Sequence, residues 1–198
     1  MILINGYRSG STNNGGAIYN TGNNLNIVNS TFENNSVLVT SAHTGGGAIY
    51  NYGSNLIISG YNVFINNLAS TRGAVANSGE NFTINGFNIF MNNSVNSVVG
   101  AIWNNESFFS LNGFNNFTDN YAGQYGGAIY LGYNNTLRNI LINGSNNFVN
   151  NSALALGGAI MNVRGINFVI NGSINSFTTL EIILVMVLHY KTKMGLIF

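Results

Sequence analysis

The sequence predicts an all-β protein: a right-handed parallel β-helix, or solenoid, in which about six coils of three short strands stack along one axis. Two motifs that recur in constant order, Gly-Gly-Ala-Ile and Phe-x-x-Asn, indicate this fold. Apolar and polar residues also alternate around both motifs, a period of two that is typical of strands and not of helices. One such unit cannot bury its own apolar face, whereas stacked copies can.

The first predicted strand of each coil contains the Gly-Gly-Ala-Ile motif. Its copies start 31, 26, 27, 27 and 31 residues apart. Three strands in such a unit suit one triangular coil, whereas a propeller blade needs four strands and about 40–45 residues. Stacking in register would place the fourth motif residues in one interior aliphatic column: Ile18, Ile49, Val75, Ile102, Ile129 and Ile160.

The second predicted strand is an alternating apolar pair that precedes Asn-Gly or Ser-Gly. Both members of each pair are expected to face the interior, because residues two apart in a strand share a face. The pairs are Leu56/Ile58, Phe82/Ile84, Phe109/Leu111, Ile140/Ile142 and Phe168/Ile170, with a looser copy at Leu25/Ile27.

The third predicted strand carries Phe-x-x-Asn. Its aromatic residues are expected to form an interior column: Phe32, Phe64, Phe90, Phe117 and Phe148. Its asparagines are expected at a turn, where Asn tolerates the left-handed conformation and its amide can bond the next coil: Asn35, Asn67, Asn93, Asn120 and Asn151. The extra residues of the longest units, in segments 36–45 and 152–156, are predicted to be surface loops.

The two ends of the chain depart from the repeat. Residues 2–6 match residues 140–144, so the chain is expected to begin in mid-coil, as a fragment, with an apolar-pair strand. The repeats are predicted to cover residues 1–176. Residues 177–198 form a divergent tail that contains no Asn. Two explanations stay open: the tail is read out of frame, or it is a natural C-terminal strand or cap.

The composition excludes several classes of function. Charged residues make up 6% of the chain and the net charge is +1, which is too little to hold nucleic acid. The chain has no Cys, so a disulfide framework and a thiolate metal site are excluded. The apolar run 180–188 is shorter than the ~20 residues of a membrane span. No cofactor or metal site is predicted, and the two histidines lack metal-binding spacing.

A carbohydrate-active β-helix enzyme, a polysaccharide lyase or hydrolase, is the main alternative. Such enzymes need clustered carboxylates. Glu33 and Asp119 lie about three coils apart, roughly 14 Å at the stacking distance. Glu80 and Glu106 follow successive Gly-Ala motifs at different offsets and are interpreted as two solvated turn carboxylates. No catalytic residue is therefore predicted, and the chain is not expected to be an enzyme.

The position after the aliphatic column is the best candidate for binding. It holds Tyr19, Tyr50, Trp103 and Tyr130, with Ala76 and Met161 in the same row. Alternation along the strand places these side chains outside if the isoleucines lie inside. An exposed aromatic stripe could stack against sugar rings or a partner surface. The favoured alternative is that the side chains pack on one another and only stabilise the sheet.

The two motifs in tandem resemble the chlamydial polymorphic outer membrane protein repeat, and also the Asn/Thr-rich adhesin-like β-helix proteins of methanogenic archaea. The resemblance covers roughly residues 1–178. It implies a β-helix displayed outside the cell, on the outer membrane or cell envelope, with a role in adhesion or surface coating. Host-cell glycans or other surface proteins are the implied partners. We therefore expect a non-catalytic, adhesin-like or structural segment, or else a nonfunctional fragment of a larger surface protein.

Overall fold

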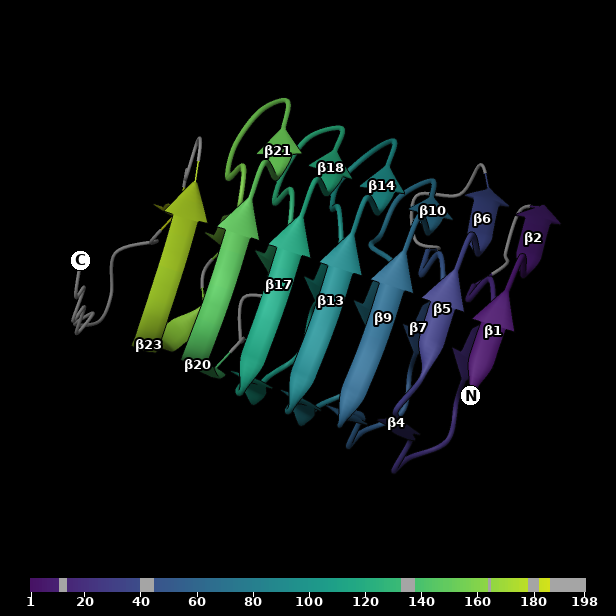
Figure 1. Cartoon of the computed structure of the whole chain (residues 1–198), viewed down its shortest axis with the longest axis horizontal. Helices are drawn as coiled ribbons and strands as arrows, with labels where there is room; N and C mark the ends of the chain where they lie inside the picture. The colour runs from purple at the N-terminus through teal and green to yellow at the C-terminus, as the bar shows by residue number, and fades with distance from the viewer. Residues whose placement is uncertain (11–13, 40–44, 133–137, 164, 178–181, 186–198) are drawn as a thin grey trace.

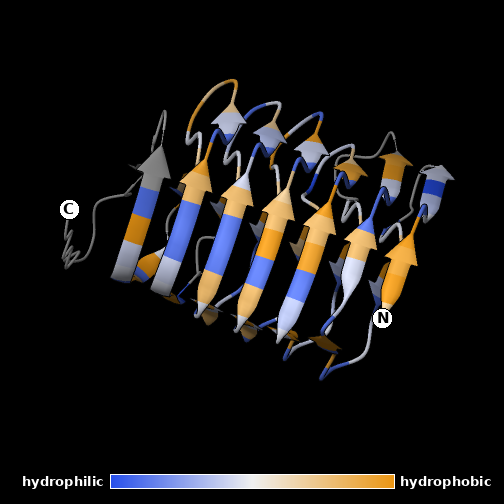
Figure 2. Ribbon diagram, viewed as in Figure 1, coloured by the Kyte–Doolittle hydropathy of each residue, from blue (hydrophilic) through white to orange (hydrophobic). Residues whose placement is uncertain are grey.

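The chain folds as the predicted right-handed parallel β-helix, in which all strand pairs of the described residues are parallel (Figure 1). Three parallel sheets run along one axis, and no described residue is helical. Bands of similar hydropathy run across neighbouring strands, because equivalent residues of successive coils stack (Figure 2). The computed structural model describes residues 1–10, 14–39, 45–132, 138–163, 165–177 and 182–185.

The Gly-Gly-Ala-Ile strands form a seven-stranded sheet. Its pairing register places the six predicted Ile and Val residues in one column, and all of them except Ile18 are fully buried. The aliphatic column is therefore confirmed. The strands are β3 (Ile18–Asn20), β7 (Ile49–Asn51), β11 (Val75–Asn77), β15 (Ile102–Asn104), β19 (Ile129–Leu131), β22 (Ile160–Val163) and β24 (Ile182–Val185).

The apolar-pair strands and the Phe-x-x-Asn strands belong to one 11-stranded sheet. The two long strands β20 (Arg138–Val149) and β23 (Ile166–Phe177) run through both rows and join them. The apolar-pair strands are β4 (Asn26–Val28), β8 (Ile57–Ser59), β12 (Phe82–Ile84) and β16 (Phe109–Leu111). The strands of the other row are β1 (Ile2–Ile4), β5 (Thr31–Glu33), β9 (Tyr61–Ile65), β13 (Phe87–Met91) and β17 (Phe114–Thr118).

The predicted aromatic column is the centre of the core. Its neighbouring rings stack in parallel with centroids 4.7–4.9 Å apart and planes within 5° of each other. Each of these five rings is at most 2% exposed. A ring separation equal to the spacing between strands leaves no gap along the axis, so the core is continuous from coil to coil.

A third, six-stranded sheet lies where the sequence predicts only loops. Segments 36–45 and 152–156 each begin with a short strand, so the loop prediction is wrong at those positions. Several of these strands have only two residues, too few for an alternating pattern to be recognised. The strands are β2 (Tyr7–Gly10), β6 (Ser36–Val39), β10 (Leu68–Ala69), β14 (Ser94–Val95), β18 (Tyr121–Ala122) and β21 (Ser152–Ala153).

The asparagines of Phe-x-x-Asn form a buried ladder through the molecule. From Asn35 to Asn120, each side-chain Nδ2 donates to the Oδ1 of the Asn in the next coil at 2.9–3.0 Å. The backbone N–H of the same residue donates to that Oδ1 at 3.1 Å. The inter-coil bonding that the sequence predicts is thus confirmed.

The left-handed conformation, however, falls one residue earlier than predicted. The residues with positive φ are those just before each ladder Asn, and they are partly or fully exposed at the corner. The ladder residue itself can then point inward and bond its neighbours. The positive-φ residues are Asn34, Asn66, Asn92, Asp119 and Asn150.

The first segment takes a different register from the one predicted. Leu3 of β1 pairs with Phe32, and the Gly6 N–H donates to Asn35 Oδ1 at 2.9 Å. Residues 2–6 therefore occupy the Phe-x-x-Asn row, and their assignment to the apolar-pair row is wrong. Both rows alternate apolar and polar residues, so the sequence distinguishes them only by the number of residues before the following Gly-Gly. The short segment between Gly6 and Gly15 fits the Phe-x-x-Asn row.

Near the other end, the last apolar pair, Phe168/Ile170, is confirmed by its pairing with Ile140 and Ile142. Phe177 pairs with Val149, one position beyond the aromatic column. In the tail, β24 pairs in parallel with β22, so residues 182–185 add a strand to the Gly-Gly-Ala-Ile sheet. The out-of-frame origin of the tail stays a prediction, and residues 186–198 lie outside the described part of the chain.

Candidate binding surface

The predicted stripe after the aliphatic column stacks in register but is not exposed. Tyr50, Trp103 and Tyr130 are only 3–6% exposed, and Tyr19 alone keeps half of its surface in solvent. The prediction of an exposed stripe is therefore wrong for three of its four aromatic residues. These three side chains pack together with Ala76, Val99 and Met161 in a second apolar cluster outside the seven-stranded sheet. A binding role for the stripe residues stays a prediction.

The segments that lead into the Gly-Ala motifs cover this stripe. Val98 and Tyr125 pack against the cluster, and the Tyr125 and Tyr130 ring centroids lie 6.5 Å apart. Arg72 crosses the row: its guanidinium carbon lies 4.0 Å from the Trp103 ring centroid. Alternation places a side chain inside or outside the coil, but it does not reveal a linking segment that folds over the outer face.

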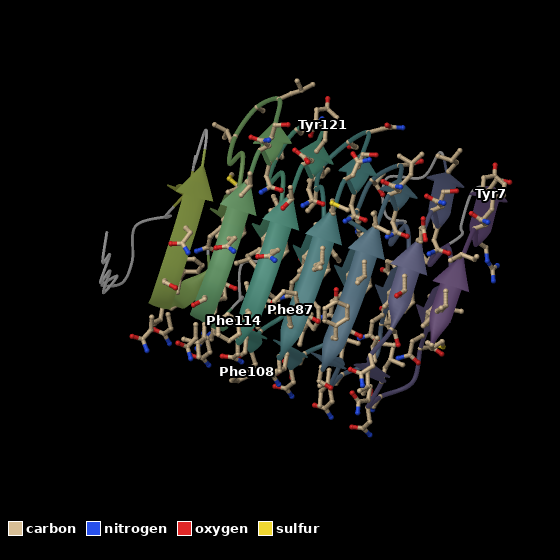
Figure 3. The ribbon with its side chains drawn as sticks, viewed as in Figure 1. Tyr7, Phe87, Phe108, Phe114 and Tyr121 are labelled. Carbon is tan, nitrogen blue, oxygen red and sulfur yellow. The ribbon has the colours of Figure 1, made fainter. Side chains whose placement is uncertain are left out.

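A different aromatic row lies exposed on the 11-stranded sheet. We call it the outer aromatic row, and it consists of Tyr61, Phe87 and Phe114 at the start of β9, β13 and β17. Phe87 and Phe114 are labelled in Figure 3. The three residues pair directly in register and are 53%, 40% and 62% exposed. The rings of Tyr61 and Phe87 stack with centroids 5.4 Å apart and planes 7° from parallel.

Corner glycines and a second Asn ladder hold this row in place. Each of its residues follows a glycine with positive φ: Gly60, Gly86 or Gly113. The next residue in each strand is a buried Asn whose amide donates back to a corner carbonyl, as Asn88 Nδ2 does to Asn85 O at 2.9 Å. These asparagines also bond one another at 2.8–2.9 Å, from Asn62 through Asn88 and Asn115 to Asn146. The side chain of each such Asn is held inside by hydrogen bonds to the corner carbonyl and to the Asn of the neighbouring coil. Because successive side chains of a strand point to opposite faces, the preceding aromatic side chain points outward.

Two further rows share this outer face. One row continues from Val63 and Ile89 to Asn116, Asn147 and Asn175, where each amide donates to the one before it at 2.7–3.1 Å. Ser145 continues the outer aromatic row, and its hydroxyl accepts a hydrogen bond from Ser173 at 2.9 Å. The face thus passes from apolar rings to amides and hydroxyls along the rod.

The third row of the face contains one acidic residue, Glu33. It comprises Glu33, Ile65, Met91, Thr118 and Val149. Among the described side chains of the three rows, Glu33 alone is ionisable at neutral pH. Such a surface can contact apolar groups and form hydrogen bonds with uncharged polar groups, but it has few charges with which to bind a charged ligand.

The outer aromatic row is not among the predicted features, although the sequence contains a signal for it. In three successive coils an aromatic residue directly follows the glycine of Ser-Gly or Asn-Gly. The predicted third strand starts at Phe-x-x-Asn, three residues too late, so this position is assigned to a turn. Extending the period-two pattern back from Phe64 and Asn62 would have placed Tyr61 on the outer face.

The acidic residues are dispersed in the structure. Glu33 and Asp119 lie on strands or corners three coils apart, as predicted. Glu106 takes the position of Gly79, because Asn104 and Asn77 donate to their carbonyls in the same way. Glu80 lies one position out of register with it. No group of three metal-ligating side chains occurs in the described residues, and His43 and His189 lie outside them.

None of the described residues belongs to a helix with the length and apolarity that a membrane crossing requires. No curated protein and no solved structure matches the chain. One family model does match it, in two places. Each match runs from the Phe-x-x-Asn strand of one coil to the Gly-Gly-Ala-Ile strand that follows. The resemblance stated from the motifs is confirmed: residues 29–52 and 116–132 match the model of the Chlamydia polymorphic membrane protein (Chlamydia_PMP) repeat.

Proposed function

We propose that this chain is a non-catalytic structural and adhesive repeat segment of a protein displayed on the cell surface. The observation that supports it best is the burial of both repeated motifs. The Phe column, the Asn ladder and the aliphatic column except Ile18 are at most 3% exposed, so these motif residues build the rod and present no side chain for chemistry. Contacts with other molecules are left to the outward residues between the motifs, such as the outer aromatic row.

The repeat architecture suits such a role. Six coils spaced by about 4.8 Å make a rod of roughly 30 Å, and further coils can extend it without a change of fold. Among the described residues the acids are dispersed and give no carboxylate pair of the kind that polysaccharide cleavage needs. The match to the Chlamydia polymorphic membrane protein repeat supports an outer membrane or cell-envelope location for the parent protein. Host-cell glycans or other surface proteins are its proposed partners.

Surface labelling tests the location. Antibodies raised against the purified chain should label intact source cells, and the label should disappear after brief protease treatment of those cells. Labelling that requires permeabilised cells would contradict the proposal.

Two assays test adhesion and catalysis. Beads coated with the chain should adhere to host cells, whereas albumin-coated beads should not. A screen for depolymerisation of neutral and acidic polysaccharides should release no new chain ends. Release of such ends by the purified chain would assign an enzyme instead.

A further inference from the structure

We infer that the outer aromatic row and the amides that follow it along the rod, Asn116 and Asn147, form a binding surface for a neutral, extended glycan chain. This inference rests on the proposed adhesive function and names its ligand class. It is carried by three features of the three outward rows: their exposed rings, their amides and hydroxyls, and the presence of one charged residue, Glu33, among their described side chains.

The exposed rings supply the apolar half of the site. Phe87 and Phe114 remain 40% and 62% exposed although each has a neighbour in the next coil. Large aromatic side chains are normally buried, and three in one continuous row are unusual on a monomer surface unless something covers them. The corner glycines and the Asn ladder beneath hold the rings on a rigid sheet, so binding would cost little ordering of the protein. The C–H faces of sugar rings pack on such aromatic surfaces.

The amides and hydroxyls supply the polar half. Asn116 and Asn147 are half-buried on the outer face, in line with Val63 and Ile89. Amide groups can both donate to and accept from sugar hydroxyls, and serine hydroxyls such as that of Ser145 can do the same. Along the rod the rings of the first coils are followed by amides and hydroxyls, with Phe114 and Asn116 on the same strand. Such a face matches a ligand that carries both C–H faces and hydroxyl groups.

The scarcity of charged residues on the face favours a neutral glycan over an acidic one. Glu33 is the single ionisable residue among the described side chains of the three outward rows, and it lies at the N-terminal end of the face. An acidic glycan would need Lys or Arg there, and these rows contain neither. The spacing selects an extended chain: the row repeats at each coil, about 4.8 Å, which is close to the length of one sugar unit in an extended polysaccharide. A regular row of aromatic rings suits a regular ligand better than an irregular protein surface.

Isothermal titration calorimetry on the purified 198-residue chain tests this inference. The probes are cellohexaose, chitohexaose and mannohexaose as neutral glycans, and a hyaluronan hexasaccharide as an acidic one. At least one neutral probe should bind, and it should bind more tightly than hyaluronan. The double variant Phe87→Ser/Phe114→Ser should weaken that binding by about tenfold or more.

The matched control is Tyr52→Ser, because Tyr52 is 62% exposed but lies after β7, away from the outer aromatic row. It should leave glycan binding unchanged. Thermal unfolding followed by circular dichroism checks that each variant is folded. If the double variant does not fold, the single variant Phe114→Ser at the end of the row is measured in its place.

The inference is overturned if no neutral probe binds, if the row variants bind as tightly as the parent chain, or if Tyr52→Ser weakens binding equally. Sedimentation of the same variants detects another occupant: self-association that the double variant abolishes, without glycan binding, would assign the row to a second copy of the chain. The surface-labelling and bead assays are independent of these results. Adhesive beads without glycan binding would reject the ligand class and leave the proposed function standing.

Discussion

The guanidinium of Arg72 lies over the ring of Trp103, with 4.0 Å between its central carbon and the ring centroid. From the same side chain, Nη1 donates to the Tyr50 hydroxyl at 3.2 Å. Tyr50 and Trp103 are two coils apart, and the residue between them in the row is Ala76. Arg72 thus bridges the two aromatic residues across the gap that the small side chain leaves, and it helps to close the stripe to solvent.

This bridge predicts a fluorescence change, because Trp103 is the single Trp of the chain. Arg72→Ala should uncover the indole, shift its emission to longer wavelength and lower the free energy of unfolding by about 1–2 kcal/mol, through the lost cation–π contact and the lost packing of the Arg stem. Arg8→Ala is the control, because Arg8 is exposed on β2. An unchanged emission maximum in Arg72→Ala would show that the arginine does not shield the ring.

The two faces of β13 predict opposite sensitivities to truncation. Phe90 points inward and is fully buried between two stacked rings, whereas Phe87 points outward in the same strand. Phe90→Ala should cost about 3–5 kcal/mol of stability, because it removes buried apolar surface and leaves a cavity. Phe87→Ala should cost less than about 1 kcal/mol. Urea unfolding of both variants checks this, and equal losses would contradict the assignment of the faces.

The buried Asn ladder predicts a pH-dependent variant. Asn93 Nδ2 donates to Phe64 O at 2.9 Å and to Asn120 Oδ1 at 3.0 Å. Asn93→Asp would place a carboxylate against both acceptors, and burial together with these acceptors should raise the pKa of the new carboxyl. Because that pKa is higher in the folded chain than in the unfolded one, the loss of stability should be largest at pH 7. It should diminish as the pH falls through the raised pKa.

Asn92→Asp is the matched control for this variant. Asn92 is exposed with positive φ, and Asp119 occupies the same position in the next coil. Its stability should therefore differ little from that of the parent at pH 7 and at pH 4. Thermal unfolding at both pH values checks the pair, and a pH-independent Asn93→Asp variant would show that the ladder site is open to water.

The backbone conformation of Phe108 predicts that its replacement by Asn will stabilise the fold. Its φ is 64°, a left-handed conformation that a bulky residue adopts at a cost of roughly 1–2 kcal/mol. The equivalent residues of the other coils are asparagines with the same sign of φ, and Asn81 Nδ2 donates to Asn55 Oδ1 at 3.1 Å. Phe108→Asn should relieve the backbone strain and extend this chain of amides. Its unfolding temperature should rise, whereas Phe114→Asn, at an extended position, should give no such gain.

Repetition explains which parts of the fold could be predicted from the sequence. The aliphatic column, the Phe column and the Asn ladder each recur in five or six copies, and a residue that recurs at one position of a solenoid must stack on its own copies. The register of Ile49 on Val75 or of Phe64 on Phe90 therefore followed from the spacing of the motifs alone.

The features that the sequence did not reveal lack that repetition. The strand of Leu68 and Ala69 is too short for alternation to be recognised. The cover over the aromatic stripe comes from unlike residues, Arg72 over Trp103 and Tyr125 against Tyr130, in segments that differ between coils. The outer aromatic row was missed because its signal lies at the junction of turn and strand, where element boundaries are least certain.

The distance between spin labels at Thr31 and Asn175 tests the central claim of in-register stacking most directly. The two positions lie on β5 and β23 in one row of the outer face, which passes through Val63, Ile89, Asn116 and Asn147. Five strand spacings separate them, about 24 Å in all. The chain has no Cys, so Thr31→Cys/Asn175→Cys can be labelled at these two sites alone. Stacked coils predict a narrow distribution of distances centred near that value, and a broad distribution that extends well beyond it would contradict the β-helix.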